Sequence, residues 1–451
     1  FKITLLIVMS LVTHGVFATS EQPEVLLMMS SHASKPKGEL LKSLAKDHPF
    51  KFTVYSTKGK SEETVKADWS KAKLVMLDGI NPALSKFMFA KYQPYLTEMP
   101  TVPVISLGDL YNEKMNQGLS EQDSKAIGAY YKNAGRDNYR NLMIYLSNQV
   151  LGVSERQAMP VQEVPNVGLY HYALDSQVTS DEEMFFQFLN AEAIQPVIAV
   201  GMHRSVVDYE QQQIVDSLIK SLEDKGAKAF GFYFEGNDEA LNYTDLLLDD
   251  NGKARVDLII NYRALHYVEK RRAEFEKVGV PVLHALNYTE GDQAKFEQDN
   301  AGVSPSLTPF FLVMPEDTGS ADPTIIAANQ DGEKVAIPYQ LSAFAERAFN
   351  HAKLAHTANA EKKVATFIWN YPPGEKNVGA AFLDVPSSIE KIAKAMKAKG
   401  YNVEVTDHKQ LIEYAGKLLR PYYRGEDAEA LVELGLADYL PLSTYLTWFN
   451  G

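Results

Sequence analysis

The stretch YEQQQIVDSLIKSLEDKGAKAFGFYF, residues 209–234, shows most clearly how this chain is built. Its first half carries apolar residues at the spacing of one helix face, namely Ile214, Leu218, Ile219 and Leu222. Lys225-Gly226 then ends the helix, because glycine readily adopts the backbone conformation that follows a helix. Residues 229–234 are an unbroken apolar run of strand length. An amphipathic helix followed by an apolar strand predicts a parallel sheet with helices on its faces.

The same alternation of helix and strand extends in both directions from this unit. Upstream, strands are predicted at residues 24–29, 51–55, 73–77 and 102–107, and helices at 37–46, 62–72 and 136–150. A second series of strands is predicted at 167–171, 197–200, 228–234, 256–260, 280–284 and 310–313. A third block has strands at 364–369 and 402–405 around a helix at 387–399 that opens on a serine cap. We therefore predict an α/β protein with several doubly wound, flavodoxin-like or Rossmann-like parallel-sheet domains in tandem.

The two ends of the chain predict a signal peptide and a truncated last domain. Lys2 is followed by an apolar run at 3–12 and by Val16-Phe17-Ala18, the arrangement of a secretory signal cleaved after Ala18. The run is shorter than the about 20 residues of a membrane span, which favours export to the periplasm. The alternative is an inner-membrane anchor, and this segment is the one membrane contact that we predict. The chain begins with Phe and ends in an aromatic stretch without a closing element, so we expect a fragment.

The domain boundaries follow from the series of strands and from a linker that Pro160 and Pro165 bracket. We place a signal peptide at 1–18, an N-terminal α/β domain at 19–155 and a second α/β region at 160–355. The start of a larger, truncated domain occupies 360–451.

Composition and missing motifs exclude several classes of function. The net charge is −13, with 45 Lys and Arg against 58 Asp and Glu, so the chain repels the phosphates of nucleic acid. There are no cysteines, which excludes disulfides, cysteine-bound zinc, iron–sulfur clusters and a cysteine nucleophile. There is no Gly-x-x-x-x-Gly-Lys-Ser/Thr loop either, so we predict no nucleotide site in this chain.

Three histidines stand at the ends of predicted strands: His171, His203 and His284. In open α/β sheets, ligands bind beyond the carboxyl ends of the strands, so this placement suggests a binding site. The alternative for each of them is a histidine that only hydrogen-bonds a loop carbonyl.

Two loops carry groups that suit a metal or a flat ligand. Glu316 stands in Met314-Pro315-Glu316-Asp317, after a predicted strand that the proline would end, and adjacent carboxylates suit a divalent cation or proton transfer. A plain acidic turn is the alternative. Tyr371 opens the loop Tyr371-Pro372-Pro373-Gly374, whose prolines would hold its ring ready to stack on a conjugated ligand. A tight crossover loop is the alternative there.

A set of segments shares its pattern with one known family: Asn370-Tyr371-Pro372-Pro373-Gly374, residues 379–388, Lys399-Gly400-Tyr401, residues 166–171, Met202-His203-Arg204-Ser205 and Pro315-Glu316. In these segments the chain resembles the large subunit of the cobaltochelatase and magnesium chelatase (CobN) family. The resemblance runs in matching order from about Asn138 to the end, as expected of the N-terminal portion of a longer protein. The chain departs from the family pattern at Tyr172, where the family has proline, and after Asp317, where the family's Asp-Gly pair is missing.

The resemblance implies the tetrapyrrole-binding large subunit of a metal chelatase of the cobaltochelatase type. Its substrates would be a corrin or porphyrin ring and a divalent metal, cobalt or alternatively iron or magnesium, and ATPase subunits would be its partners in the cytoplasm. Glu316, helped by His171 or His203, would relay protons. Glu316 and His171 would also be transient ligands of the metal. Arg204 and Tyr371 would hold the ring. An exported haem-iron dechelatase of this family and a periplasmic ligand-binding protein without catalysis are the alternatives.

Overall fold

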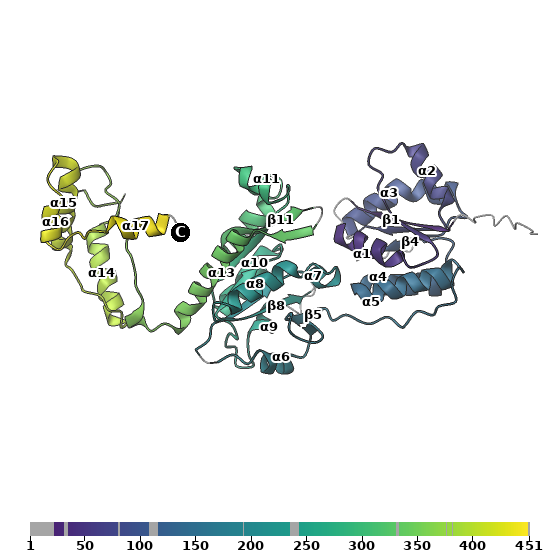
Figure 1. Ribbon diagram of the computed structural model, residues 1–451, viewed down its shortest axis with the longest axis horizontal. Helices are drawn as coiled ribbons and strands as arrows, with labels where there is room; N and C mark the ends of the chain where they lie inside the picture. Colours follow the sequence, from purple (N-terminus) through teal and green to yellow (C-terminus); the bar gives the residue numbers. More distant parts are fainter. Residues whose placement is uncertain are drawn as a thin grey trace, which may run out of the picture. The chain divides into compact units, whose positions relative to one another are not determined.

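The computed structural model describes residues 22–30, 35–79, 82–107, 116–192, 194–234, 243–330, 333–375, 377–380 and 382–449. The predicted signal peptide lies outside these residues. The chain divides into two compact units, Phe1–Asn350 and His351–Gly451, called here the first and the second unit. The first unit holds two separate β-sheets with their helices, and the described part of the second holds helices and irregular segments (Figure 1).

The first sheet has four parallel strands in the order β2-β1-β3-β4, the beginning of the flavodoxin-like order. The strands are β1 (Glu24–Met29), β2 (Lys51–Tyr55), β3 (Leu74–Asp78) and β4 (Val104–Leu107). The helices are α1 (Lys35–Ala45), α2 (Glu62–Lys71), α3 (Pro82–Glu98), α4 (Glu121–Asn133) and α5 (Gly135–Tyr145), and a π-helical turn at Leu146–Val150 continues α5. We call this sheet with its helices the first half of the unit.

Both faces of the first sheet are covered, because β1 sends alternate side chains into two separate cores. Val25 and Leu27 pack in a core with α1, α4 and α5, and Leu26 and Met28 pack in a core with α2 and α3. Figure 1 shows α2 and α3 on one side of the sheet and α4 and α5 on the other. Trp69 of α2 is fully buried in the second of these cores. Strands buried on both faces explain the unbroken apolar runs of the sequence.

The second sheet has eight strands in the order β12-β11-β10-β9-β7-β8-β5-β6. They are β5 (Val167–Tyr170), β6 (Val178–Thr179), β7 (Val197–Gly201), β8 (Lys228–Phe234), β9 (Leu258–Asn261), β10 (Val282–Tyr288), β11 (Ala321–Gln330) and β12 (Glu333–Ala336). The five strands from β11 to β8 run parallel, whereas β5 and β12 lie antiparallel to their neighbours at either end. We call this sheet with its helices the second half. The predicted α/β class with parallel sheets is confirmed.

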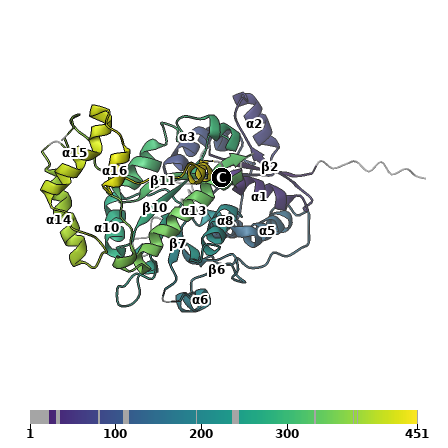
Figure 2. The same ribbon diagram turned by 60° about the vertical axis from the view of Figure 1, so that its left-hand side comes forward.

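Helices connect and cover the strands of the second sheet. They are α6 (Glu182–Leu189), α7 (Ser205–Asp208), α8 (Gln213–Glu223), α9 (Tyr243–Leu247), α10 (Val268–Val278), α11 (Gln293–Gln298), α12 (Met314–Asp317) and α13 (Pro338–Lys353). The unit at 209–234 has the predicted form, since α8 packs its apolar face against β8. Figure 2 shows α8 together with β7, β10 and β11 of the same sheet. No described helix of the chain is both long and apolar enough to cross a membrane.

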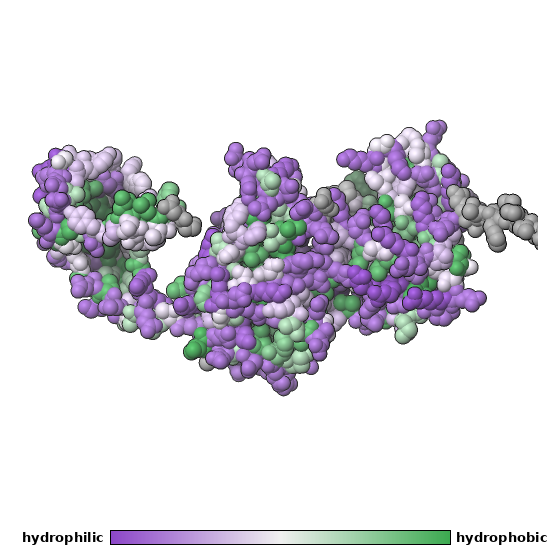
Figure 3. All heavy atoms as spheres, in the orientation of Figure 1, coloured by the Kyte–Doolittle hydropathy of each residue, from purple (hydrophilic) through white to green (hydrophobic). Residues whose placement is uncertain are grey.

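The second unit contains α14 (Val385–Ala398), α15 (His408–Arg424), α16 (Glu429–Glu433) and α17 (Leu442–Phe449). The predicted strands at 364–369 and 402–405 were wrong, because neither segment pairs with another strand among the described residues. A strand needs neighbours to bond its backbone and cover its side chains. Phe367 is instead 96% exposed and Trp369 80% exposed, and apolar side chains of this unit face solvent in Figure 3.

Two local predictions were also wrong. The segment at 310–313 is not a strand but part of a π-helical turn, η3 (Pro309–Val313), that continues into α12. Pro315 lies in the first turn of that helix, where proline needs no hydrogen-bond partner, so it begins a helix rather than ending a strand. The helix predicted at 387–399 begins at Val385, and its cap is Asp384, whose carboxylate accepts a hydrogen bond from the Ser387 N–H.

A buried ion pair closes the carboxyl end of the first sheet. The Lys37 ammonium of α1 lies 2.8 Å from the Asp78 carboxylate at the end of β3, and Asp78 has no exposed surface. The Tyr131 hydroxyl of α4 donates to the same carboxylate oxygen at 2.7 Å. Burial alone would lower the pKa of Lys37, but the charges and hydrogen bonds of Asp78 and Tyr209 together outweigh it and the pKa is raised. Lys37 therefore stays charged and fixes α1 to the sheet.

We expect Asp78→Asn to lower the free energy of unfolding by about 3–5 kcal/mol, because it leaves the Lys37 charge buried without its partner. Urea unfolding at pH 7 measures this change. Combining it with Lys37→Met should recover most of the loss, since no unpaired charge is then buried. Glu121→Gln is the control: it removes an exposed pair with Lys125 and should leave the free energy of unfolding almost unchanged. Equal effects of Asp78→Asn and Glu121→Gln would contradict this account.

Candidate functional site

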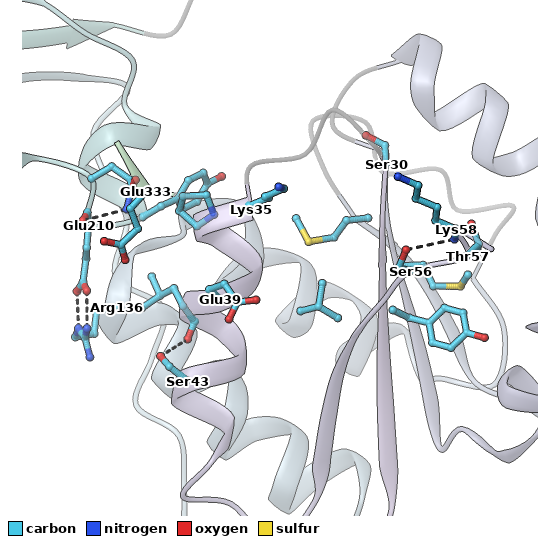
Figure 4. Close-up of a pocket in the computed structure, with 18 of the residues that line it drawn as sticks. Ser30, Lys35, Glu39, Ser43, Ser56, Thr57, Lys58, Arg136, Glu210 and Glu333 are labelled. Carbon is cyan, nitrogen blue, oxygen red and sulfur yellow. Dashed lines mark hydrogen bonds and ion pairs between the residues drawn. The ribbon is translucent and has the colours of Figure 1, made fainter. Parts of the chain in front are cut away.

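A cavity of about 1220 Å³ lies at the carboxyl end of the first sheet, between the two halves of the first unit (Figure 4). The last residues of β1 and β2, including Met28, Met29 and Tyr55, form one wall. The second half supplies the facing wall through the segment between α7 and α8 and through β12, with Tyr209, Glu210, Gln211, Gln213 and Glu333. The carboxyl edge of an open parallel sheet is where such folds bind ligands, so this cavity is a candidate site.

Polar side chains stand where the first two strands end. Ser30 follows β1, and Ser56, Thr57 and Lys58 follow β2 and line the cavity. The Lys58 N–H donates to the Ser56 hydroxyl oxygen at 3.3 Å, which holds this turn in shape. In Figure 4 the side chains of Lys58 and of Lys35, the first residue of α1, extend into the cavity from different walls. The cavity thus combines thioether and aromatic surface with the ammonium groups of Lys35 and Lys58 and the carboxylates of Glu39, Glu210 and Glu333.

Side-chain contacts join the two halves beside this cavity. The Arg136 guanidinium of α5 bonds both carboxylate oxygens of Glu210, one of them at 2.5 Å. Arg204 donates to the Asp208 carboxylate at 3.0 Å and to the backbone oxygen of Lys132 at 3.2 Å. Arg204, which we predicted to bind the ring, therefore braces the second half against α4. Its role in ring binding stays a prediction.

A smaller pocket of about 230 Å³ adjoins the cavity at the carboxyl end of the second sheet. Its walls come from the ends of β10 and β11, from α7, from β12 and from the start of α1. Lys35, Pro36 and Gln211 line both spaces, so the pocket and the cavity are continuous. The carboxyl edges of both sheets therefore open onto neighbouring parts of one cleft.

His203 is the predicted site residue that stands at this edge. It follows β7 by two residues, and its side chain is partly accessible to solvent. Partial loss of solvation, with smaller contributions from the positive charges of Arg263 and Lys334, lowers the pKa of His203 to about 3. The imidazole is therefore neutral at pH 7 and is a weak base. The positive charges around it disfavour a divalent cation there.

His171 lies elsewhere, because β5 runs antiparallel to β8 and its carboxyl end points away from the cleft edge. The ring is buried, and its Nδ1 accepts a hydrogen bond from the Ala173 N–H at 3.1 Å. Its Nε2 therefore carries the proton and donates to Glu223 of α8 at 3.0 Å. The ring also stacks on Tyr172, with centroids 4.6 Å apart. His171 thus holds the loop after β5 to α8.

Glu316 lies in α12, which precedes β11 and so stands at the amino end of the parallel strands. Its side chain is exposed, and the neighbouring Asp317 pairs with Arg272 of α10 at 2.5 Å. The structure therefore does not bring Glu316, His171 and His203 together in one cluster. In the part of the chain that is described, no group of three or more His, Asp or Glu side chains could hold a metal ion. The catalytic and metal-binding roles of these residues stay predictions.

His284 is a core residue rather than a strand-end group. It lies within β10, and its Nδ1 accepts a hydrogen bond from the Asn261 side-chain amide at 2.9 Å. It is 1% exposed, and burial lowers its pKa to about 4. The prediction that it ends a strand was wrong, since β10 continues to Tyr288.

Tyr371, in the second unit, has an exposed ring. Hydrogen bonds within its loop and from α15 hold the loop in place. The Asn370 amide donates to the Gly374 and Asn377 backbone oxygens at 2.8 and 2.7 Å. The Tyr423 hydroxyl of α15 donates to Asn370 Oδ1 at 2.6 Å. A rigid loop with an exposed ring is compatible with stacking, and the ring-binding role of Tyr371 stays a prediction.

The CobN/Magnesium Chelatase family model matches residues 128–451 of this chain. The chain belongs to this family. It is 26% identical over 311 residues to the magnesium-chelatase H protein of Chlorobaculum parvum, a match that spans 63% of this chain and 23% of that protein. It is 20% identical over 353 residues to the aerobic cobaltochelatase CobN protein of Sinorhizobium sp, across 74% of this chain and 27% of that protein. The chain therefore spans about a quarter of the length of these family members.

The fold agrees with that of a solved chelatase subunit. The catalytic subunit of cobaltochelatase from Mycobacterium tuberculosis superposes with a TM-score of 0.60 at 18% identity, over 89% of this chain and 33% of that one. At this identity the likeness shows the fold alone. The family membership predicted from the sequence is confirmed, and the relatives include both magnesium and cobalt enzymes.

Sequence reasoning missed the lysines of the cleft. Lys58 closely follows a strand of the first sheet, Lys35 begins α1, and Lys334 lies on the last strand of the second sheet. The rule that we applied to histidines, that ligands bind where parallel strands end, would have found Lys58 directly. Lys35 and Lys334 could not be found in this way, because only the structure shows that they share a pocket.

The stability of this family member should fall as the pH drops from about 6.5 to 4, partly through His284. The unfolded chain takes up a proton near pH 6.5, whereas folded His284 stays neutral until about pH 4, so acid favours unfolding. This difference corresponds to about 3 kcal/mol. His284→Gln keeps an acceptor for Asn261 and should flatten the pH dependence of urea unfolding by that amount. Parallel curves for the two proteins would show that His284 does not titrate in this way.

Proposed function

We propose that this chain is the tetrapyrrole-handling part of a metal-chelatase large subunit, of the cobaltochelatase type, and that the cleft of the first unit holds the ring. Membership of the CobN/magnesium chelatase family carries the proposal. The cleft supports it, because the volume of about 1220 Å³ exceeds the about 300–1,000 Å³ of ordinary ligand pockets. Rings are the large, flat molecules on which chelatases act, and they need such room.

The lining of the cavity suits the chemistry of a tetrapyrrole. The ring is a conjugated, largely apolar disc that carries carboxylate arms. Met28, Met29 and the rings of Tyr55 and Tyr209 offer polarisable surface for such a disc. Lys35 and Lys58 place ammonium groups where carboxylate arms would emerge. The proposal therefore assigns the thioether and aromatic side chains to the disc and the lysines to its arms.

Metal transfer requires the pyrrole N–H protons to leave the ring or return to it as the metal moves. Of the three predicted proton-relay residues, the positions favour His203, because it is neutral at pH 7 and stands at the cleft edge. Glu316 and His171 stand away from that edge. We propose His203 as the group that takes up a pyrrole proton, and the cations around it favour releasing the proton again.

Cobalt is the metal that we propose, and iron or magnesium are the alternatives. The sequence has no P-loop, so ATP-driven insertion would need partner ATPase subunits. The signal-like N-terminus favours a second candidate, an exported haem-iron dechelatase that removes metal without such partners. A periplasmic ligand-binding protein is a third candidate, because two sheets that open onto one cleft also suit binding without catalysis.

Ring binding can be tested by titrating the chain with protoporphyrin, haem and a cobalt-free corrin and recording difference spectra. We expect a shifted absorption band with at least one ring. Ser43→Trp fills the cavity from α1 and should weaken that binding at least about tenfold. Ser70→Trp is the matched control, because Ser70 is also an exposed helix serine bonded to the carbonyl three residues before it but lies on α2, outside the cavity. Silent spectra with all three rings would contradict the proposal, and equal effects of the two variants would move the ring site elsewhere.

Export predicts that the mature protein starts near Thr19. Mass spectrometry of the protein recovered from the periplasm of its host should find the chain cut after Ala18. Recovery of the uncut N-terminus from membranes would show the anchor instead. Recovery from the cytosol would overturn export and favour the ATP-driven insertase over the dechelatase.

A further inference from the structure

The charged side chains that line the small pocket of about 230 Å³ are all basic. Lys35 of α1 and Lys334 of β12 line it from different halves of the first unit. The other polar lining groups are neutral: the hydroxyls of Ser205 and Thr289 and the amides of Gln211, Asn287 and Asn329. No Asp or Glu is among its described lining residues. A pocket with ammonium groups and neutral donors but no carboxylate attracts an anion.

Several other lysines of this chain form ion pairs with carboxylates. Lys37 pairs with Asp78, Lys60 with Asp68 and Lys225 with Glu346. For Lys35 and Lys334 the described residues offer no ion pair. In a chain of net charge −13, two ammonium groups that share a pocket without a carboxylate are a sign of a binding site.

The surroundings of Lys334 also favour a bound anion. Its ammonium lies 5.5 Å from the centroid of the Tyr262 ring, and loss of solvation lowers its pKa. An anion in the pocket would restore the stabilisation that water supplies elsewhere. The Tyr262 hydroxyl donates to Asn287 Oδ1 at 2.6 Å, and this bond leaves the Asn287 NH₂ group as a donor for a ligand. Lys334 and Asn287 thus offer a charged and a neutral donor in one pocket.

Size and position limit what the anion can be. The pocket is smaller than the about 300–1,000 Å³ of sites for drug-sized ligands, so it suits a small anion or one acidic arm of a larger molecule. Lys35, Pro36 and Gln211 also line the large cavity. A ligand in the cavity can therefore extend an arm past Lys35 toward Lys334.

We propose that this pocket is a carboxylate-binding subsite, in which Lys35, Lys334 and the Asn287 amide hold an acidic side arm of the ligand whose body fills the large cavity. With a tetrapyrrole as ligand, the inference rests on the proposed function. The subsite then recognises an acid arm of the ring and fixes its orientation in the cleft. A ring without free carboxylates loses this contact and binds only through the contacts of its apolar disc.

The test compares protoporphyrin IX with its dimethyl ester, which keeps the ring and removes the acid groups. Affinities are measured by fluorescence quenching in the same mild detergent for the unmodified chain and for Lys334→Gln, Lys35→Gln and Lys277→Gln. The first two variants remove a pocket ammonium. Lys277 is the control, because it is an exposed lysine in the last turn of α10, before β10 and away from the carboxyl edge. Thermal unfolding checks that the variants fold.

We expect Lys334→Gln and Lys35→Gln each to weaken the free acid about tenfold, the scale of one charge-assisted hydrogen bond. The ester should bind all proteins with the same affinity, and Lys277→Gln should change neither ligand. Equal losses for acid and ester, or no loss for either, would overturn the subsite.

Failure of the proposed function would look different. If the chain binds neither porphyrin, succinate replaces them as probe in calorimetric titrations. Binding of succinate that Lys334→Gln weakens about tenfold would support the carboxylate subsite without the ring. Undetectable succinate binding would overturn it, and so would inorganic phosphate that binds more tightly than succinate.

Discussion

The carboxylate of Asp78 ends β3 without any exposed surface, and both the Lys37 ammonium and the Tyr131 hydroxyl bind one of its oxygens. A charge buried this deeply is tolerated only while its partners stay in place. The pair therefore fixes the first turn of α1 relative to the sheet. Lys35 and Pro36, two residues and one residue before Lys37, line both the cavity and the small pocket. The cleft thus takes part of its shape from an ion pair whose two residues do not line it.

The sequence predicted the strands that are buried on both faces and failed where a segment has no such neighbours. The runs at 24–29, 51–55 and 228–234 coincide with β1, β2 and β8, because a continuous apolar run of this length is typical of a strand covered on both faces. The run at 310–313 is too short to separate helix from strand by its pattern. The segments at 364–369 and 402–405 have strand composition, but pairing depends on a partner strand that the local sequence does not specify.

The site was harder to predict, because strand direction decides which loops meet. His171 and His203 look alike in the sequence, since each follows an apolar strand. Only the antiparallel pairing of β5 with β8 sends His171 away from the edge where His203 stands. The shared pocket of two cleft lysines could not be predicted for a related reason. Lys35 and Lys334 lie 299 positions apart, and the local sequence around either one does not predict that they are close in the fold. Family resemblance carried the prediction of function where geometry could not.

The two halves of the first unit are joined partly by contacts that water reaches. Arg136 and Glu210 are 47% and 38% exposed in their side chains, whereas the Lys37–Asp78 pair lies in the interior. Dissolved ions screen exposed charges over about 10 Å at 0.1 M salt but hardly affect buried ones. Ionic strength therefore acts selectively on this molecule. It loosens the junction beside the cleft and leaves the interior of the first half unchanged, so the salt content of the surrounding compartment becomes part of how firmly the cleft is held.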